Sequence, residues 1–130
     1  MLLSEIAKIL SCEIFSCREN LDCEIQYGCA SDLMSDVLAF SQPGAVLLTG
    51  LVNPQTIHTA YISEIKAIVF VRGKKPQEDV TELAESKSIP LLSTNYSMYE
   101  ACGLLYKAGL ESTMEYIPPN SSKKSFNSSS

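Results

Sequence analysis

From residue 21 onward, short apolar segments alternate with longer segments in which apolar residues recur every three or four positions. The continuous apolar runs are 45–49, 67–71 and 89–93. Such runs are typical of strands buried between two layers of helices, and the segments between them predict amphipathic helices. Residues 21–27 instead alternate apolar and polar side chains, which predicts an edge strand. Four successive strand–helix units indicate an α/β fold with a mostly parallel sheet of about four to five strands and helices on both faces.

Capping residues mark where the predicted helices begin and end. Ser31 and the pair Asn53–Pro54 predict two N-termini, and the helix after Ser31 should bury Leu33, Met34, Val37 and Leu38. Residues 77–87 begin with acidic side chains and end with Lys, as the helix dipole favours. Ser97 predicts the start of the last helix, and Gly109 its left-handed end.

The segment before residue 21 is expected to be a small addition to the sheet. Ser4 predicts the N-cap of a short helix, and residues 13–15 predict a brief strand followed by a turn at 18–20. With 130 residues, the chain is expected to fold as one domain over residues 1–117. Residues 118–130 are rich in Ser, Asn and Lys, which predicts a disordered polar tail.

Charge and hydropathy narrow the classes of partner. Fifteen acidic and ten basic residues give a net charge of −5, which disfavours binding to nucleic acid. No apolar run approaches the roughly 20 residues that a membrane span requires, and the first residues do not resemble an export signal. We therefore expect a cytoplasmic protein with no membrane or nucleic-acid partner.

The cysteines and the single histidine do not form a recognisable catalytic or metal-binding motif. Cys12, Cys17, Cys23 and Cys29 are spaced by five or six residues, whereas metal motifs place two cysteines about two to four residues apart. Structural thiols are the favoured interpretation, with a cysteine-bound iron–sulfur cluster as an alternative. His58 is expected at the surface. The sequence therefore predicts no metal, no cofactor and no catalytic residues.

A basic loop after the second apolar run is the best candidate for binding chemistry. Arg72-Gly73-Lys74-Lys75 lacks the Walker pattern, but it precedes a helix N-terminus at a strand end, where an anion can be held. A solvated turn is the simpler alternative. The carboxyl ends of parallel strands meet at one edge of the sheet, so further residues are expected there. The complete set of candidate ligand-binding residues is Thr49, Gly50, Asn53, Arg72, Gly73, Lys74, Lys75, Thr94 and Asn95.

Several segments resemble the DRTGG-domain family, in particular the small stand-alone members encoded near iron hydrogenases. The segments are 28–39, Leu48-Thr49, Asn53-Pro54, 89–94 and Tyr99-Glu100-x-x-Gly103-x-Leu105-Tyr106, so the resemblance covers about residues 3 to 110. It implies an α/β fold similar to the N-terminal domain of HPr kinase/phosphorylase. It also implies a dimerising regulatory role, linked to hydrogenase or redox metabolism.

The chain departs from the motif after which the family is named. It has no Asp-Arg-Thr-Gly-Gly string, and it carries Gly50-Leu51-Val52-Asn53-Pro54 and Arg72-Gly73 at the corresponding strand ends. The favoured hypothesis is a non-catalytic homodimer that senses an anionic small molecule or a protein partner. The alternative is a small enzyme or an anion- or nucleotide-binding protein that uses the strand-end loops.

Overall fold

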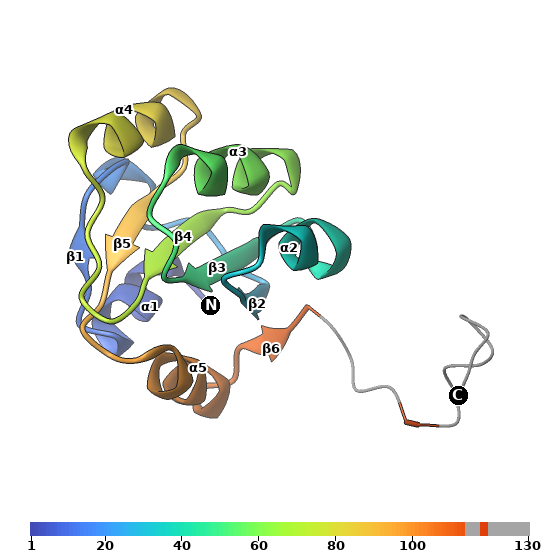
Figure 1. Ribbon diagram of the computed structural model, residues 1–130. Coiled ribbons are helices and arrows are strands. Elements are labelled where there is room, and N and C mark those ends of the chain that lie inside the picture. The colour runs from blue at the N-terminus through green and yellow to red at the C-terminus, as the bar shows by residue number, and fades with distance from the viewer. Residues whose placement is uncertain (114–117, 120–130) are drawn as a thin grey trace.

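The computed structural model describes residues 1–113, 118 and 119, and its central feature is one six-stranded sheet (Figure 1). The strands are β1 (Glu13–Ile14), β2 (Tyr27–Ala30), β3 (Ala45–Thr49), β4 (Ala67–Phe70), β5 (Leu91–Ser93) and β6 (Glu111–Ser112). Their order is β1-β5-β4-β3-β2-β6, and only the β1–β5 pair is antiparallel. The expected mostly parallel α/β sheet is confirmed, with one strand more than expected.

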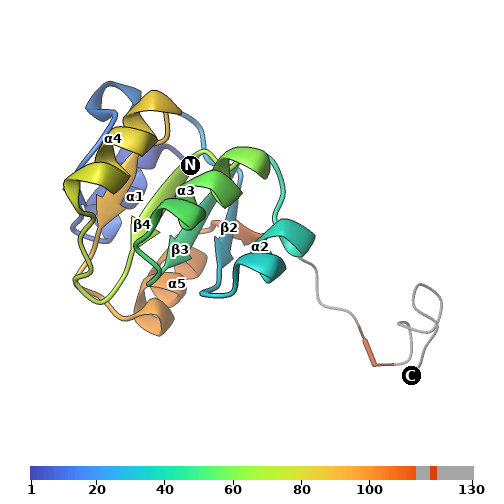
Figure 2. The same cartoon turned by 45° about the horizontal axis from the view of Figure 1, so that its top comes forward.

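Helices cover both faces of the sheet (Figures 1 and 2). The α-helices are α1 (Leu3–Ile9), α2 (Met34–Phe40), α3 (Pro54–Ile62), α4 (Glu78–Ser86) and α5 (Met98–Lys107). α2, α3 and α4 lie on one face, and α1 and α5 lie on the other. This division follows from connection chirality, because β2 to β5 are neighbours in chain order and right-handed crossovers place their helices on one side.

The strand residues divide between two cores, one on each face. Val46, Leu48 and Val69 pack with α1 and α5, whereas Leu47 and Ile68 pack with α2, α3 and α4. Since successive strand side chains point to opposite faces, a strand buried on both sides must be apolar at every position. This explains the continuous apolar runs in the sequence.

Three predicted helix boundaries are confirmed, two by side-chain hydrogen bonds and one by a backbone angle. The side chain of Asn53 accepts from the N–H of Thr56 at 3.0 Å, and the hydroxyl of Ser97 accepts from the N–H of Glu100 at 3.2 Å. Gly109 has φ +107°, in the left-handed region that favours glycine. α4 begins and ends within one residue of the predicted 77–87 segment.

The predicted edge strand at 21–27 is wrong in both position and role. β2 begins at Tyr27 and is an interior strand between β3 and β6. The alternation reflects burial of Ile25 against the core beside α1, with Cys23 and Leu21 partly buried there. The backbone here bonds to the N-terminal residues, with the N–H of Leu3 donating to the carbonyl of Cys23 at 3.0 Å.

Two predicted N-caps are also wrong. The hydroxyl of Ser31 accepts from the N–H of Leu33 at 3.0 Å, a local turn, and α2 begins only at Met34. The helix buries Met34 and Val37 but leaves Leu33 57% and Leu38 53% exposed, because only one narrow stripe of this short helix faces the sheet. Ser4 lies within α1, whose N-cap is Leu2.

The expected disordered tail, 118–130, lies outside the described residues apart from Pro118 and Pro119. Among the described residues, no helix combines the length and the apolar character that crossing a membrane requires.

Candidate ligand-binding site

The connections of the sheet single out the carboxyl ends of β4 and β5. β4 leads into α4 on one face, and its neighbour β5 leads into α5 on the other face. Two adjacent parallel strands whose connections depart to opposite faces leave a crevice at their carboxyl ends, where α/β proteins bind ligands. The loops at this position contain Arg72, Gly73 and Lys74 after β4, and Thr94 and Asn95 after β5.

The two loops are joined by backbone hydrogen bonds. The N–H of Arg72 donates to the carbonyl of Tyr96, and the N–H of Gly73 donates to that of Thr94, both at 2.8 Å. Arg72 and Gly73 have φ of 60° and 70°. A left-handed conformation costs a non-glycine residue about 1–2 kcal/mol, so these bonds hold the arginine in a specific and unfavourable backbone geometry.

Most other left-handed non-glycine residues have a simpler structural cause. Ser11, Glu64 and Ser88 each directly follow the C-cap of a helix, a position where left-handed residues are common. Arg72 follows a strand, so this explanation does not apply to it. Arg72 and Gly73 are instead the central residues of a tight turn, in which the N–H of Lys74 donates to the carbonyl of Val71 at 3.2 Å, and the bonds to Tyr96 and Thr94 hold this turn against the loop after β5.

The guanidinium of Arg72 reaches across the end of β3 towards Asp32. Its Nη2 lies 3.9 Å from Oδ2 of Asp32, and both side chains are 46% exposed. The other carboxylate oxygen, Oδ1, accepts from the hydroxyl of Thr49 at 3.0 Å and from the N–H of Gly50 at 2.7 Å. Asp32 is thus fixed to the end of β3, and it holds the arginine through a single long ion contact.

Gly50 is required by this arrangement. A Cβ added at residue 50 would overlap Nη2 of Arg72, because the guanidinium lies directly over the glycine. The glycine therefore lets the arginine lie across the backbone of the strand end. Arg72, Gly50 and Thr49, all predicted from the sequence, come together here.

Lys75 is separated from the other cations of the basic loop by an ion pair with β1. Nζ of Lys75 lies 3.1 Å from Oε1 of Glu13, on β1 at the other side of the loop. The side chain of Lys74 is exposed, and its carbonyl accepts from the hydroxyl of Ser93 at 2.6 Å. Arg72 and Lys74 therefore remain as the cations of this loop that are not held in an ion pair with β1.

The remaining predicted residues divide between structural and open roles. Asn53 caps α3. Thr94 is buried, and its hydroxyl donates to the carbonyl of Leu10 at 2.6 Å, which ties β5 to the end of α1. Asn95 is exposed, and its Oδ1 would lie 3.1 Å from a Cβ added at Gly73. Asn95 therefore places a neutral polar side chain beside the Arg72 loop.

Sequence reasoning missed Asp32. It follows the true end of β2, but the misplaced strand at 21–27 concealed its position at the strand ends. A polar residue two positions after the end of a parallel strand is the signal that would have identified it. His58, by contrast, is exposed on α3 as expected.

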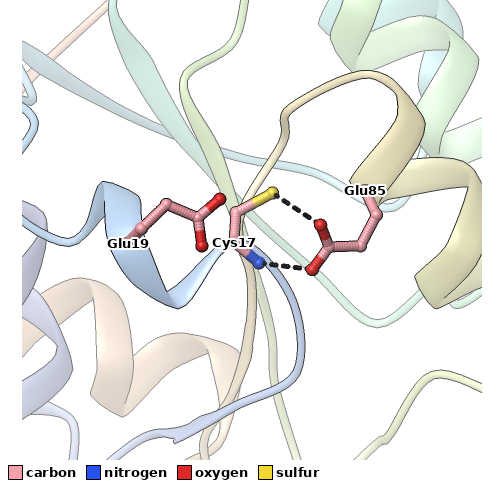
Figure 3. A group of neighbouring side chains, drawn as sticks. All are labelled: Cys17, Glu19 and Glu85. Atoms are coloured by element: carbon pink, nitrogen blue, oxygen red, sulfur yellow. Dashed lines mark hydrogen bonds between the residues drawn. The ribbon is translucent and has the colours of Figure 1, made fainter.

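Cys17, Glu19 and Glu85 form a second polar cluster (Figure 3). One ligand atom from each lies within 4.8 Å of the others, and no other such group occurs in the described part of the chain. Glu85 is already engaged, accepting from the N–H of Cys17 at 2.9 Å and from its thiol at 3.8 Å. Burial, reinforced by the charge of Glu85, raises the pKa of Cys17 to about 11. The protonated thiol serves as a hydrogen-bond donor that ties the N-terminal segment to α4.

The four cysteines considered for an iron–sulfur cluster are spread over the fold. Cys12 and Cys23 pack against the core beside α1, whereas Cys29 packs against the core on the opposite face. Cys17 is bonded to Glu85 of α4. This distribution favours the structural interpretation, because one cluster cannot be reached from both faces of a filled sheet.

Comparison with known proteins agrees with the fold. No curated protein matches the chain. Among solved structures, it is similar to the CBS and DRTGG domains of the regulatory region of a Clostridium perfringens pyrophosphatase, complexed with the activator diadenosine tetraphosphate, with a TM-score of 0.66 and 16% sequence identity. The alignment covers 92% of this chain and 51% of that one, so this chain spans about half of it. The DRTGG domain family model matches residues 5–108, and the chain therefore belongs to the DRTGG domain family.

Proposed function

We propose that this chain is a non-catalytic regulatory module that senses a small anionic ligand at the carboxyl ends of β3, β4 and β5, with Arg72 as the principal anchor. The observation that carries the proposal is the state of Arg72. It is held in a left-handed conformation at the junction of two loops, and its side chain is 46% exposed. A guanidinium with one long contact to a carboxylate retains donors for a phosphate or carboxylate group.

Two further features support an anionic ligand. Lys74 lies two residues from Arg72 and is exposed, and Asn95 adds a neutral polar group beside Gly73. The similar pyrophosphatase regulatory region was crystallised with diadenosine tetraphosphate, a polyanionic nucleotide. A regulatory role without catalysis agrees with the residues present, because the chain has one histidine and it lies exposed on α3.

A thermal-shift screen of nucleotides and phosphorylated metabolites, followed by calorimetric titration, tests the anion site. A ligand that binds the native state raises the melting temperature, by an amount equivalent to about 2.7 kcal/mol at 100 times its Kd. Arg72→Ala should abolish the shift, whereas Lys75→Ala, a matched loss of one cation from the same loop, should retain it because Lys75 is paired with Glu13. Unchanged affinity in Arg72→Ala would refute the assignment.

We also propose that the module acts as a homodimer. The exposed large apolar side chains include Leu38 and Phe40 on α2 and Tyr61 and Ile62 on the neighbouring α3. Apolar groups concentrated on adjacent helices are typical of an interface, and a two-fold dimer would bury the same surface on both copies. Light scattering should give the mass of a dimer for the wild type and of a monomer for Ile62→Glu. A monomeric wild type at high concentration would contradict this proposal.

A further inference from the structure

A concave site lies between α5 and strands β2 and β6. Its volume is about 500 Å³, within the range of roughly 300–1,000 Å³ found for small-molecule sites. Its surface is mostly apolar, and the described residues that line it include no Lys, Arg or His. The groove therefore lacks the cations that a phosphate requires, and its chemistry differs from that of the Arg72 loop.

The wall formed by α5 presents aromatic side chains around a gap. Tyr99 and Tyr106 line the groove and are 91% and 74% exposed. They are seven residues apart, or about 10 Å along the helix axis, and lie on the same side of the helix as Gly103. A Cβ added at Gly103 would meet nothing within 4 Å. The helix surface is thus bare between two rings that remain in contact with water.

The sheet side of the groove is closely packed at Gly28, where a Cβ would lie 3.2 Å from Cδ2 of Leu110. Gly28 therefore contributes no side chain and Leu110 lies beside it, while Glu111 of β6, an exposed residue, is the one acidic residue among the described lining residues. Cys102 also lines the groove, and burial raises the pKa of its thiol, which keeps it neutral. An uncharged planar group is the occupant that such apolar walls and aromatic edges suit.

The groove adjoins the Arg72 site. Ala30 and Leu48 line it, and each lies two residues before Asp32 and Gly50 respectively. Two residues of extended strand span about 7 Å, which is comparable to the separation of a base and a phosphate across one ribose. A ring in the groove and an anion at Arg72 can therefore belong to one molecule.

We propose that this groove binds the heteroaromatic ring of a nucleoside or nucleotide, stacked against Tyr99 and Tyr106 over Gly103. The proposal of a ring site depends only on the shape and lining of the groove. The extension to a nucleotide rests on the proposed anion site.

Calorimetric titration with adenosine and with AMP separates the two sites. Because the chain contains no Trp, stacking can also be followed through quenching of 2-aminopurine riboside fluorescence. The wild type should bind adenosine saturably, and AMP more tightly. Gly103→Leu should abolish adenosine binding, while the matched control Gly103→Ala adds a single methyl to the same helix and should retain it. Tyr106→Ala should weaken binding roughly tenfold, as for loss of one base–aromatic stack.

Arg72→Ala makes the two proposals separately falsifiable. It should leave adenosine affinity unchanged and remove the additional affinity for AMP. If AMP binds but is insensitive to Gly103→Leu and to Tyr106→Ala, the ring site is refuted while the anion site stands. If Gly103→Leu abolishes adenosine binding but Arg72→Ala does not lower the affinity for AMP, the anion site is refuted while the ring site stands. Failure of the wild type to bind adenosine overturns the ring site. Conversion of a dimer to a monomer by Gly103→Leu also overturns it, because a second copy of the chain would then occupy the groove.

Discussion

At the scale of single residues, Asp32 joins the structural and functional parts of the strand ends. Its Oδ1 satisfies the hydroxyl of Thr49, which is fully buried, and the buried N–H of Gly50, whereas Oδ2 faces the half-exposed Arg72. The first role concerns stability and the second concerns the position of a ligand-binding cation. These roles predict different responses to substitution.

Asp32→Ala should lower the free energy of unfolding by about 1–3 kcal/mol, because it leaves the hydroxyl of Thr49 and the N–H of Gly50 without their acceptor. Arg72→Ala, which alters an exposed side chain, should change it by about 0.5 kcal/mol or less. Urea denaturation measures both changes. They can be compared directly if the m-value, the slope of the unfolding free energy against urea concentration, is the same for each variant. Asp32→Asn retains an acceptor and should recover most of the loss; equal destabilisation by Asn and Ala would show that the charge matters more than the hydrogen bonds.

The raised pKa values of the thiols predict how the free energy of unfolding changes with pH in the alkaline range. Burial raises the pKa of every cysteine thiol, for Cys12 from the ordinary 9.0 to about 12. Above pH 9 the unfolded chain loses thiol protons that the folded chain keeps, so the free energy of unfolding falls as the pH rises from 9 towards 12 and is unaffected by these groups below that range.

Cys12→Ala should therefore show a shallower decline in stability between pH 9 and pH 11 than the wild type, as measured by urea denaturation at each pH. All other ionisable groups are common to both proteins, so their effects cancel in the difference. Identical pH profiles would mean that the thiol of Cys12 is solvated in the folded state.

At the scale of helices and strands, the sequence was most informative where burial leaves a distinct pattern. The run Ala45–Thr49 was located to the residue because a strand covered on both faces is apolar throughout. β6 is only two residues long, Glu111–Ser112, and both are exposed, so it carries no pattern to detect. The alternation at 21–27 does reflect buried apolar side chains, but they pack against the core beside α1 and do not belong to a sheet strand. Hydrophobic periodicity alone does not distinguish these two kinds of burial.

The same argument applies to the candidate site. Arg72, Gly73 and Asn95 could be placed together because parallel strands bring their carboxyl ends to one edge. The roles of Asn53 and Thr94 could not be separated from ligand binding, because a helix cap and a buried hydroxyl use the same residue types. The divergence of Lys75 depends on Glu13 of β1, a contact across 62 positions of the chain that local sequence does not contain.

Gly103 within α5 and Gly109 just after its C-cap predict opposite effects of the same substitution. Gly103 lies inside the helix with open space around it, so Gly103→Ala should stabilise the protein by up to about 1 kcal/mol. Gly109 has φ +107°, so Gly109→Ala should destabilise it by about 1 kcal/mol. Thermal denaturation of the two variants tests both; stabilisation by Gly109→Ala would show that α5 ends differently in solution.

At the scale of the whole molecule, two apolar cores share one sheet. Adjacent residues of β3, Val46 and Leu47, belong to opposite cores. Loss of packing on one face therefore loosens strands that the other face needs. α1 matters here although it is short, since Leu3, Ile6 and Leu10 are fully buried in the core on its side. The N-terminal segment is thus a component of the core and not an appendage.

Ile6→Ala tests this coupling. The substitution should lower the free energy of unfolding by about 2–5 kcal/mol, the range for truncating a fully buried large aliphatic side chain. The control Leu2→Ala, on the same segment but 37% exposed, should cost much less. Far-UV circular dichroism reports the helices on both faces, and near-UV circular dichroism reports the tyrosines. If the two cores unfold together, both signals should shift to the same lower urea midpoint in Ile6→Ala, because the strands cannot lose one covering layer and keep the other. Separate midpoints, with the α2–α4 face persisting after the α1–α5 face is lost, would show instead that the sheet supports two independently stable layers.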